Sequence, residues 1–268
     1  MTATFDDKFI DVAFDEQPEF TFGCKPDGVY ASFGETYEDA EQPLTDAEVR
    51  LAIERRDEAD AWLSYFVTRI YDQQQEGSCV GNATGQSCEV KQAKQLGKDR
   101  VVPLSPISLY KRIGTSANSG ATISDSAKEI TRRGILPLDT PENRARFGDQ
   151  VMPHTGFRSP FPPGWEATGN LFLVREILPI KTMQGIKTAG VKGDPIIVGR
   201  RGHSIAYLDL VWNAEKGRFE FQYVNSWSEQ WGSPFGEFKG GFGRDTESLI
   251  KESAGWAFAI RTIVLPAA

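Results

Sequence analysis

The spacing of apolar positions changes along the chain, from helical in the first half to strand-like in the second. Thr45, with Glu48 three positions later, has the pattern of a helix N-cap, and a charged helix is predicted to follow to about Ser64. Two more helices are predicted over Ser78–Gly97 and Ser124–Arg133, each ending at or just before a glycine. The first half is therefore predicted to be mainly helical.

The second half carries short apolar or alternating runs that are typical of strands. We expect strands over Pro195–Val198, His203–Trp212, Arg218–Asn225 and Trp256–Val264. Residues 139–170 are rich in proline and glycine, so we interpret them as the connection between two lobes. Helices followed by strands predict an α+β fold of two lobes.

Two of these strands flank a turn-like stretch and are expected to pair as an antiparallel hairpin. In that register His203 lies across from residues 225–227, and directly opposed residues have Cβ atoms about 4.5–5.5 Å apart. Asn225 is thus a natural partner for the His203 ring. A second interpretation is that Asn225 only opens a turn. Asn225 stands at the end of an apolar row formed by Phe219, Phe221 and Tyr223. An amide in such a place needs a hydrogen-bond partner.

Charge is concentrated at the N-terminus of this 268-residue chain, whose net charge is −7. Residues 1–45 hold 11 acidic residues and 2 lysines, a net of −9, which leaves the remainder near +2. An acidic chain argues against nucleic-acid binding.

We interpret residues 1–65 as an acidic arm and helix, either a pro-segment or an attachment arm with its own docking partner. An ordinary ordered segment is the alternative. Residues 66–268 form the main domain, with a helical lobe at about 78–140 and a β lobe at about 170–265.

The chain has only three cysteines, and so small and odd a number does not indicate a disulfide framework. The N-terminus has no basic region followed by an apolar run, so no signal peptide is expected, and no apolar run is long enough to predict a membrane span. Synthesis in the cytoplasm is expected, with incorporation into a virion as one destination. No cofactor or metal ion is expected.

Cys79 follows a polar loop and a Gly-Ser pair, at the predicted first turn of a helix. Backbone N–H groups and the helix dipole favour an anion there, and a thiol pKa near 8.5 can fall to roughly 3.5–7.5 in such a setting. The alternative is a small buried residue, which is what most free cysteines are. Cys88, further along the same helix, is assigned to packing, and Cys24 has no visible partner.

His203 is the better of the two histidines for catalysis, because His154 lies in the loop-rich connection and is expected at the surface. A nucleophilic thiolate needs a nearby imidazole, which protonates the leaving group. The imidazole in turn needs a third group that holds one tautomer. An amide oxygen such as that of Asn225 can do this.

Three ordered motifs together resemble the papain-like cysteine peptidases, over about residues 70–263. The loop Gln73–Cys79 resembles the nucleophile loop of that family, Gly202–Ser204 its histidine strand, and Asn225–Gly232 its Asn-Ser-Trp…Trp-Gly segment. His203 and Asn225 follow Cys79 by 124 and 146 residues, against the roughly 130–150 expected. Leu104–Pro106 and the stretch 120–135 look like those of bacterial members, which suggests a bacterial or phage-type protein.

The resemblance implies a two-lobed papain-like fold, with a helical left lobe and an antiparallel β-barrel-like right lobe. It implies that Gln73 and the backbone N–H of Cys79 bind the developing oxyanion, and that Trp227 shields the His203–Asn225 pair from water. It also implies that Gly77 and Gly120 let a substrate backbone approach closely, because glycine has no side chain to obstruct it. Ser78, Gly202 and Trp227 are the other predicted substrate-binding residues.

The sequence departs from the family pattern at two positions. Glu76 stands where secreted members carry a disulfide cysteine, which places a carboxylate near the cleft. Val80 replaces the aromatic residue that usually follows the nucleophile.

A cysteine endopeptidase acting on polypeptides through a covalent acyl-enzyme is the leading prediction. A non-catalytic papain-fold module of a larger assembly, such as a phage particle, is the first alternative. An amidase acting on peptidoglycan peptides is the second, and the Asn-Ser-Trp segment favours the peptidase over it.

Overall fold

The computed structural model describes residues 23–25, 27, 33–59, 61–200, 202–252 and 257–264. Its helices, with 3-10 turns labelled η, are α2 (Tyr37–Ala40), α3 (Asp46–Glu58), η2 (Leu63–Phe66), α4 (Cys79–Leu96), η3 (Lys98–Arg100), α5 (Pro106–Ile113), α6 (Ile123–Arg133), α7 (Pro141–Phe147), α8 (Trp165–Gly169), η4 (Asn170–Phe172), α9 (Met183–Lys192) and α10 (Glu247–Glu252). Its strands are β1 (Val174–Ile180), β2 (Ile196–Arg200), β3 (His203–Asn213), β4 (Arg218–Val224), β5 (Ser233–Phe235), β6 (Phe238–Thr246) and β7 (Ala257–Ile263).

Within the described residues the strands form one seven-stranded sheet, in the order β1-β7-β2-β3-β4-β6-β5. Every neighbouring pair is antiparallel. The predicted hairpin is β3–β4, in which Ala206 lies opposite Val224 and Asn213 opposite Arg218, with a register shift between Tyr207 and Asp209. The start of β3 and the end of β4 therefore lie at the same end of the hairpin.

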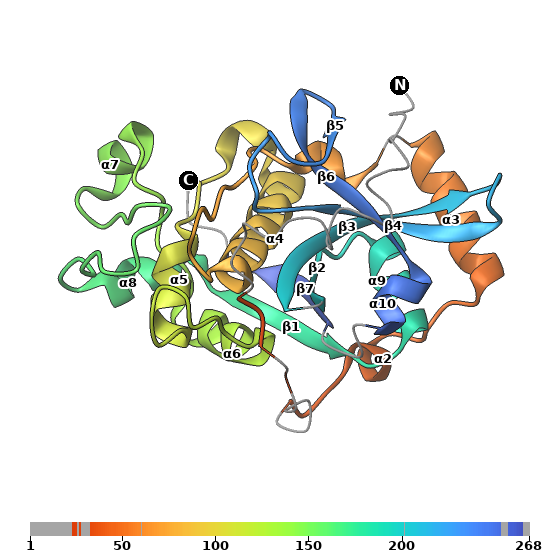
Figure 1. The fold of residues 1–268 in the computed structure, drawn as a ribbon, viewed down its shortest axis with the longest axis horizontal. Helices are drawn as coiled ribbons and strands as arrows, with labels where there is room; N and C mark the ends of the chain where they lie inside the picture. The colour runs from red at the N-terminus through yellow and green to blue at the C-terminus, as the bar shows by residue number, and fades with distance from the viewer. Residues whose placement is uncertain are drawn as a thin grey trace.

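Helix α4 lies between the two lobes (Figure 1), in contact with α5 and α6 on one side and with β2, β3 and β7 on the other. Ser78 occupies its N-cap position, and Gly97 ends it with a φ of 89°, a conformation that suits glycine. Its residues 79–93 are all buried. Cys79, its first residue, is thus held by the most enclosed helix of the described chain.

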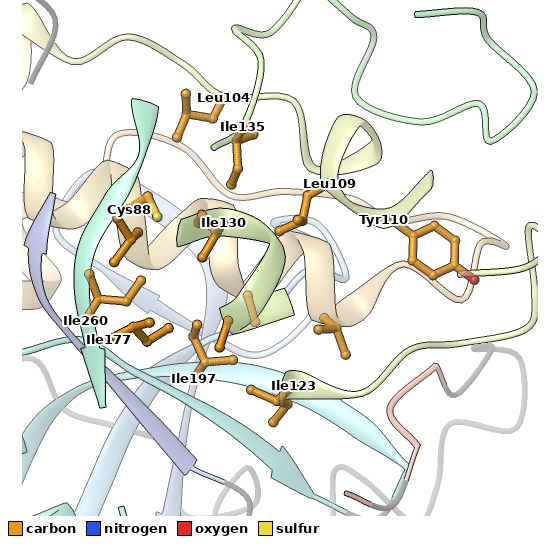
Figure 2. Close-up of a cluster of buried hydrophobic side chains, with 14 of the residues drawn as sticks. Cys88, Leu104, Leu109, Tyr110, Ile123, Ile130, Ile135, Ile177, Ile197 and Ile260 are labelled. Carbon is orange, nitrogen blue, oxygen red and sulfur yellow. The ribbon is translucent and has the colours of Figure 1, made fainter. Parts of the chain in front are cut away.

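A cluster of buried side chains joins α4, α5 and α6 to the sheet (Figure 2). Cys88 of α4 belongs to it, as the sequence predicted, together with Ile130 of α6 and Ile177, Ile197 and Ile260 of the sheet. Burial of side chains of this size stabilises a fold by about 1.5–3 kcal/mol each. The position of α4 against the sheet is therefore fixed by packing along much of its length.

A second cluster lies on the other side of the sheet, where α2, α3, α9 and α10 are grouped (Figure 1). It includes Tyr37 of α2 and Val49 and Ile53 of α3, with Ile205 and Tyr207 of β3. The described residues from 36 to 58 therefore pack into the core of the β lobe. The proposed division at residue 65, and the role of residues 1–65, stay predictions.

Several elements differ from the predicted ones. The helix that begins after Thr45 ends at Glu58 instead of Ser64. A separate turn, η2, follows because the carboxylate of Asp209 accepts the backbone N–H groups of Leu63 and Ser64, at 2.8 and 2.9 Å. The predicted connection 139–170 contains α7 and α8, and α9 lies between β1 and β2.

Candidate active site

The loop before α4 pairs with the segment that follows β4. Ser228 donates its backbone N–H to the carbonyl of Tyr71 at 3.0 Å, and Gln73 donates its backbone N–H to the carbonyl of Ser226 at 2.9 Å. Asp72 forms an antiparallel bridge with Trp227. Two motifs that are more than 140 positions apart in sequence thereby lie side by side, with Cys79 at the end of one and Asn225 at the start of the other.

The sulfur of Cys79 is surrounded by backbone N–H groups. Those of Ser204, Gly23, Val80 and Cys79 itself bond to it and lower the pKa of the thiol, but burial acts more strongly and raises that pKa to about 11. Cys79 is fully buried. Ser204 directly follows His203, so this contact brings the start of β3 against the nucleophile.

His203 is oriented by Asn225. Its ring Nε2 lies 2.8 Å from Oδ1 of Asn225. That oxygen also accepts the backbone N–H of Ser226 at 2.8 Å, which identifies it as the amide oxygen. Because an amide oxygen only accepts, Nε2 must carry the proton, and Nδ1 is then the nitrogen that can act as a base.

Trp227 covers this hydrogen bond. Its ring stacks on that of His203, with centroids 4.5 Å apart and an interplanar angle of 28°. Trp231 packs against Trp227 edge to face, with centroids 5.5 Å apart, and both tryptophans are buried. The stack excludes water from the His203–Asn225 pair and also fills the core, so both predicted roles for Trp227 fit its position.

Burial controls the protonation of the histidine. It lowers the pKa of His203 to about 4; the hydrogen bond with Asn225 raises that pKa, and the charge of Arg200 lowers it further. Together with the raised pKa of Cys79, this leaves both groups neutral at pH 7. The described state thus holds a neutral thiol and a neutral imidazole, instead of a thiolate and an imidazolium.

Gln73 is fully buried beside this pair. Its amide Nε2 donates to the carbonyl of Glu76 at 2.8 Å, and its Oε1 accepts from the hydroxyl of Ser226 at 2.7 Å. The second bond fixes the amide so that its nitrogen points along the loop that leads to Cys79. An oxyanion donor in that place stays a prediction.

A short segment of the N-terminal arm lies between the backbone at Gly202 and the backbone at Ala121, a place that is called the cleft here. Cys24 donates its backbone N–H to the carbonyl of Gly202 at 2.7 Å. Ala121 donates to the carbonyl of Gly23 at 2.7 Å, and Lys25 donates to the carbonyl of Ala121 at 2.8 Å, so that Cys24 and Ala121 form a parallel bridge. The arm is therefore bonded to both sides of the nucleophile.

The predicted binding glycines are the residues against which this segment lies. A Cβ added at Gly23 would lie 2.1 Å from the carbonyl oxygen of Gly77, and one added at Gly120 would lie 2.4 Å from the carbonyl oxygen of Gly23. Gly120 and Gly202 have positive φ values of 67° and 81°. Backbone meets backbone here with no room for side chains, which is the kind of approach that the sequence predicted for a substrate.

Ser78 does not face the arm through its side chain. Its carbonyl and hydroxyl oxygens both accept from Nδ2 of Asn82 at 3.0 Å. Asn82 in turn bonds Nε2 of His154 at 2.9 Å, and the His154 ring packs against Tyr71 with centroids 4.8 Å apart. His154 was expected at the surface; instead this packing partly buries it and lowers its pKa to about 4.

Sequence reasoning missed the place of Cys24. It is buried and follows the residue whose N–H reaches the Cys79 sulfur. Its contacts are backbone bonds to residues 121 and 202, which leave no local pattern in the sequence.

Neither a metal site nor a membrane-spanning helix is found where the structure is described. No group of three or more His, Cys, Asp and Glu side chains is placed to hold a metal ion among those residues. Nor does any of their helices combine the length and apolar character needed to cross a bilayer.

No protein-family profile matches the sequence, and no curated protein does. Solved structures do match. A digestive procathepsin L2 proteinase from Tenebrio molitor has a TM-score of 0.58 over 96% of this chain and 84% of its own, at 14% identity. Xylellain, a cysteine protease from Xylella fastidiosa, has a TM-score of 0.55 over 93% of this chain and 97% of its own, at 16% identity. The chain has a papain-like fold.

The papain-like fold confirms the predicted α+β architecture with its helical and β lobes. The bromelain protease from Ananas comosus also matches, with a TM-score of 0.51 over 75% of this chain and 95% of its own, at 15% identity. These solved neighbours are cysteine proteases. At such identities the likeness concerns the fold, so the chemistry is argued from the side chains of this chain.

Proposed function

We propose that the chain is a papain-like cysteine peptidase of the bacterial or phage type, with Cys79 as nucleophile, His203 as base and Asn225 as the residue that orients the base. The observation that supports it most is the 2.8 Å bond between Nε2 of His203 and Oδ1 of Asn225, beneath the Trp227 ring. It gives the imidazole one tautomer and turns Nδ1 into the reactive nitrogen.

In the proposed reaction the Cys79 sulfur attacks the carbonyl carbon of a peptide bond in a polypeptide substrate. His203 takes the thiol proton at Nδ1 and delivers it to the leaving amine, and water then releases the acyl group from the sulfur. The backbone N–H of Cys79 and the amide of Gln73 stabilise the oxyanion; such donors contribute about 3–4 kcal/mol each in other enzymes. Gln73 must first release the Glu76 carbonyl.

We further propose that residues 1–65 include a pro-segment, and that the described state is a latent one. In this proposal the segment Gly23–Lys25, which is hydrogen-bonded to residues 121 and 202, blocks the path of a substrate backbone. The pKa values of Cys79 and His203 keep both groups neutral. Release of the arm would let water reach the sulfur and the ring. Hydration favours the charged forms, and with them the thiolate–imidazolium pair.

The test is hydrolysis of casein by the reduced full chain, followed over hours so that molecules whose arm has left are included. Cys79→Ala is expected to lower the rate by at least about a thousandfold, as loss of a nucleophile does in other hydrolases, with the melting temperature almost unchanged. Cys88→Ala is the matched control, because Cys88 is equally buried on the same helix, and it should keep the activity of any folded fraction.

Two substrates in parallel separate the alternatives. Hydrolysis of casein but not of purified peptidoglycan supports the peptidase, whereas the reverse would assign the chain to cell-wall amidases. If neither is hydrolysed, and iodoacetamide modifies Cys79 no faster than Cys24 and Cys88 in the full chain and no faster than Cys88 after the arm is removed, the chain is a non-catalytic module.

A further inference from the structure

The N-terminal arm brings Cys24 near Cys79, so that two of the three cysteines of this chain lie in neighbouring backbone segments. The backbone N–H of Gly23 bonds to the sulfur of Cys79, and Cys24 is the next residue. Both cysteines are free and buried, with 6% and 0% of their surface exposed for Cys24 and Cys79. Burial raises the pKa of Cys24, and the charge of Cys79 raises it further.

The backbone around Cys24 is held in register with Cys79. The N–H of Cys24 bonds to the Gly202 carbonyl at 2.7 Å, on the histidine side of the cleft. The bonds of Gly23 and Lys25 to Ala121, at 2.7 and 2.8 Å, hold the other side. Cys24 is thus positioned by three backbone bonds on both sides of the nucleophile.

We propose that Cys24 and Cys79 form a reversible disulfide that locks the arm in the cleft. The proposal rests on the proposed function in that Cys79 is the nucleophile which the lock would block. A disulfide usually joins residues whose Cα atoms are about 4.4–6.8 Å apart, and Cys24 directly follows the residue whose backbone N–H bonds to the Cys79 sulfur.

A hydroperoxide is the oxidant. When the arm opens briefly, the Cys79 thiol reacts with the hydroperoxide to give a sulfenic acid and, with hydrogen peroxide, one water. The Cys24 thiol then attacks the Cys79 sulfur, the S–O bond breaks, and a second water leaves as the S–S bond forms. Each sulfur gives up one electron to the peroxide, and a dithiol such as dithiothreitol reverses the step.

Cys88 provides an internal comparison. It lies on the same helix as Cys79, but its side chain points into the hydrophobic cluster with Leu104 and Ile130 (Figure 2). Burial raises the pKa of the Cys88 thiol and the charge of Glu89 raises it further, with no contribution from another cysteine. Cys88 is therefore expected to stay a thiol when Cys24 and Cys79 are oxidised.

The experiment treats the reduced full chain with hydrogen peroxide, blocks remaining thiols with iodoacetamide in denaturant, and maps non-reduced peptides by mass spectrometry. No tryptic site separates Cys79 from Cys88, so the mapping uses the Cys88→Ala variant. We expect a peptide pair that links Cys24 to Cys79, lighter by two hydrogens, and its loss after dithiothreitol. In the unsubstituted chain, two of the three thiols should lose their labelling.

Two variants test the role of the arm. Gly23→Val keeps all three cysteines, but its side chain would meet the Gly77 carbonyl, since a Cβ there lies 2.1 Å from that oxygen, so the link should disappear. Gly34→Val is the control, because nothing lies within 4 Å of a Cβ at Gly34, and it should form the link as the parent does.

A link to Cys88, or oxidation of Cys79 to sulfinic acid without any link, overturns the proposal. The mass readout does not depend on peptidase activity. A chain that forms the Cys24–Cys79 link but hydrolyses nothing after reduction would keep the lock and refute the peptidase. A chain that hydrolyses casein yet never forms the link would do the opposite.

Discussion

At the scale of single residues, burial controls proton binding by His154. Packing against Tyr71 and the bond to Asn82 partly bury this ring. Burial lowers its pKa from 6.5 to about 4; the charge of Asp72 opposes this and that of Arg69 adds to it. The unfolded chain therefore binds a proton below pH 6.5 that the folded chain does not accept until about pH 4. Stability should be fully present above pH 6.5 and fall as the pH drops toward 4.

His154→Gln removes the titrating group and keeps a nitrogen able to reach Asn82. Its free energy of unfolding should therefore fall less between pH 7 and pH 4.5 than that of the parent, by about 2 kcal/mol, since one pKa unit corresponds to about 1.4 kcal/mol. Urea unfolding at both pH values measures this difference. An identical fall in the two proteins would mean that His154 is already protonated in the folded state at pH 4.5.

The residues at the site differ in how far the sequence could predict them. The order and spacing of Cys79, His203 and Asn225 pointed to their roles, and the hairpin register predicted that the last two meet, which the 2.8 Å bond bears out as geometry. His154 and Cys24 could not be placed. Their neighbours come from distant segments, so no local pattern of hydrophobic and polar positions records the contact.

At the scale of elements, Glu76 connects the loop before α4 to the loop that follows Met152. Met152 itself forms an isolated β-bridge with Leu138. Its Oε1 accepts the backbone N–H groups of Gly156 and Phe157 at 3.0 and 2.8 Å. The Phe157 ring packs edge to face on Tyr110 of α5, with centroids 5.5 Å apart. A carboxylate thus makes a non-covalent tie at the position where secreted papain-like proteins have a disulfide cysteine.

Glu76→Ala should lower the free energy of unfolding by about 1–3 kcal/mol, because two buried or half-buried N–H groups lose their acceptor. Hydrogen exchange at Gly156 and Phe157 should become faster while that of α4 stays slow. Glu76→Gln keeps an acceptor oxygen and should lose less stability than the alanine variant. Equal exchange rates in the alanine variant and the parent would show that the tie does not hold the loop.

Elements with a strong local signal were predicted, and those fixed by distant contacts were not. Helix α4, with its polar N-terminal loop and Gly97, and the β3–β4 hairpin were both predicted from caps and alternation. Helix α9 was missed, because its glycines and polar residues give no clear amphipathic pattern. The end of α3 was placed too late, because the turn that follows depends on Asp209 of β3.

At the scale of the whole molecule, buried polar ties join the two sides of the sheet. Lys91 of α4 lies 2.6 Å from Asp194, which also accepts from the hydroxyl of Tyr37 in α2, at 3.2 Å. Removing one partner from a buried pair of this kind typically destabilises by about 3–5 kcal/mol. The described residues after position 33 are therefore attached to the core through α2, whereas residues 23–25 are attached through the cleft.

Because of that difference, residues 23–25 can be removed without removing the contacts that hold α2 and α3 in the core. A chain that lacks residues 1–32 loses the bonds of Gly23, Cys24 and Lys25 to the cleft but keeps Tyr37 and α3 in the core.

Without the arm, the Cys79 thiol meets water, and its pKa should fall from about 11 toward or below the ordinary 8.5. Alkylation of Cys79 by iodoacetamide at pH 7.5 should then be faster by roughly a hundredfold or more, since the thiolate is the reactive form. Cys88, which is buried in the hydrophobic cluster between α4 and the sheet, is the internal reference, and its rate should not change. Unchanged alkylation of Cys79 in a truncated chain that keeps its melting temperature would mean that the arm does not control the nucleophile.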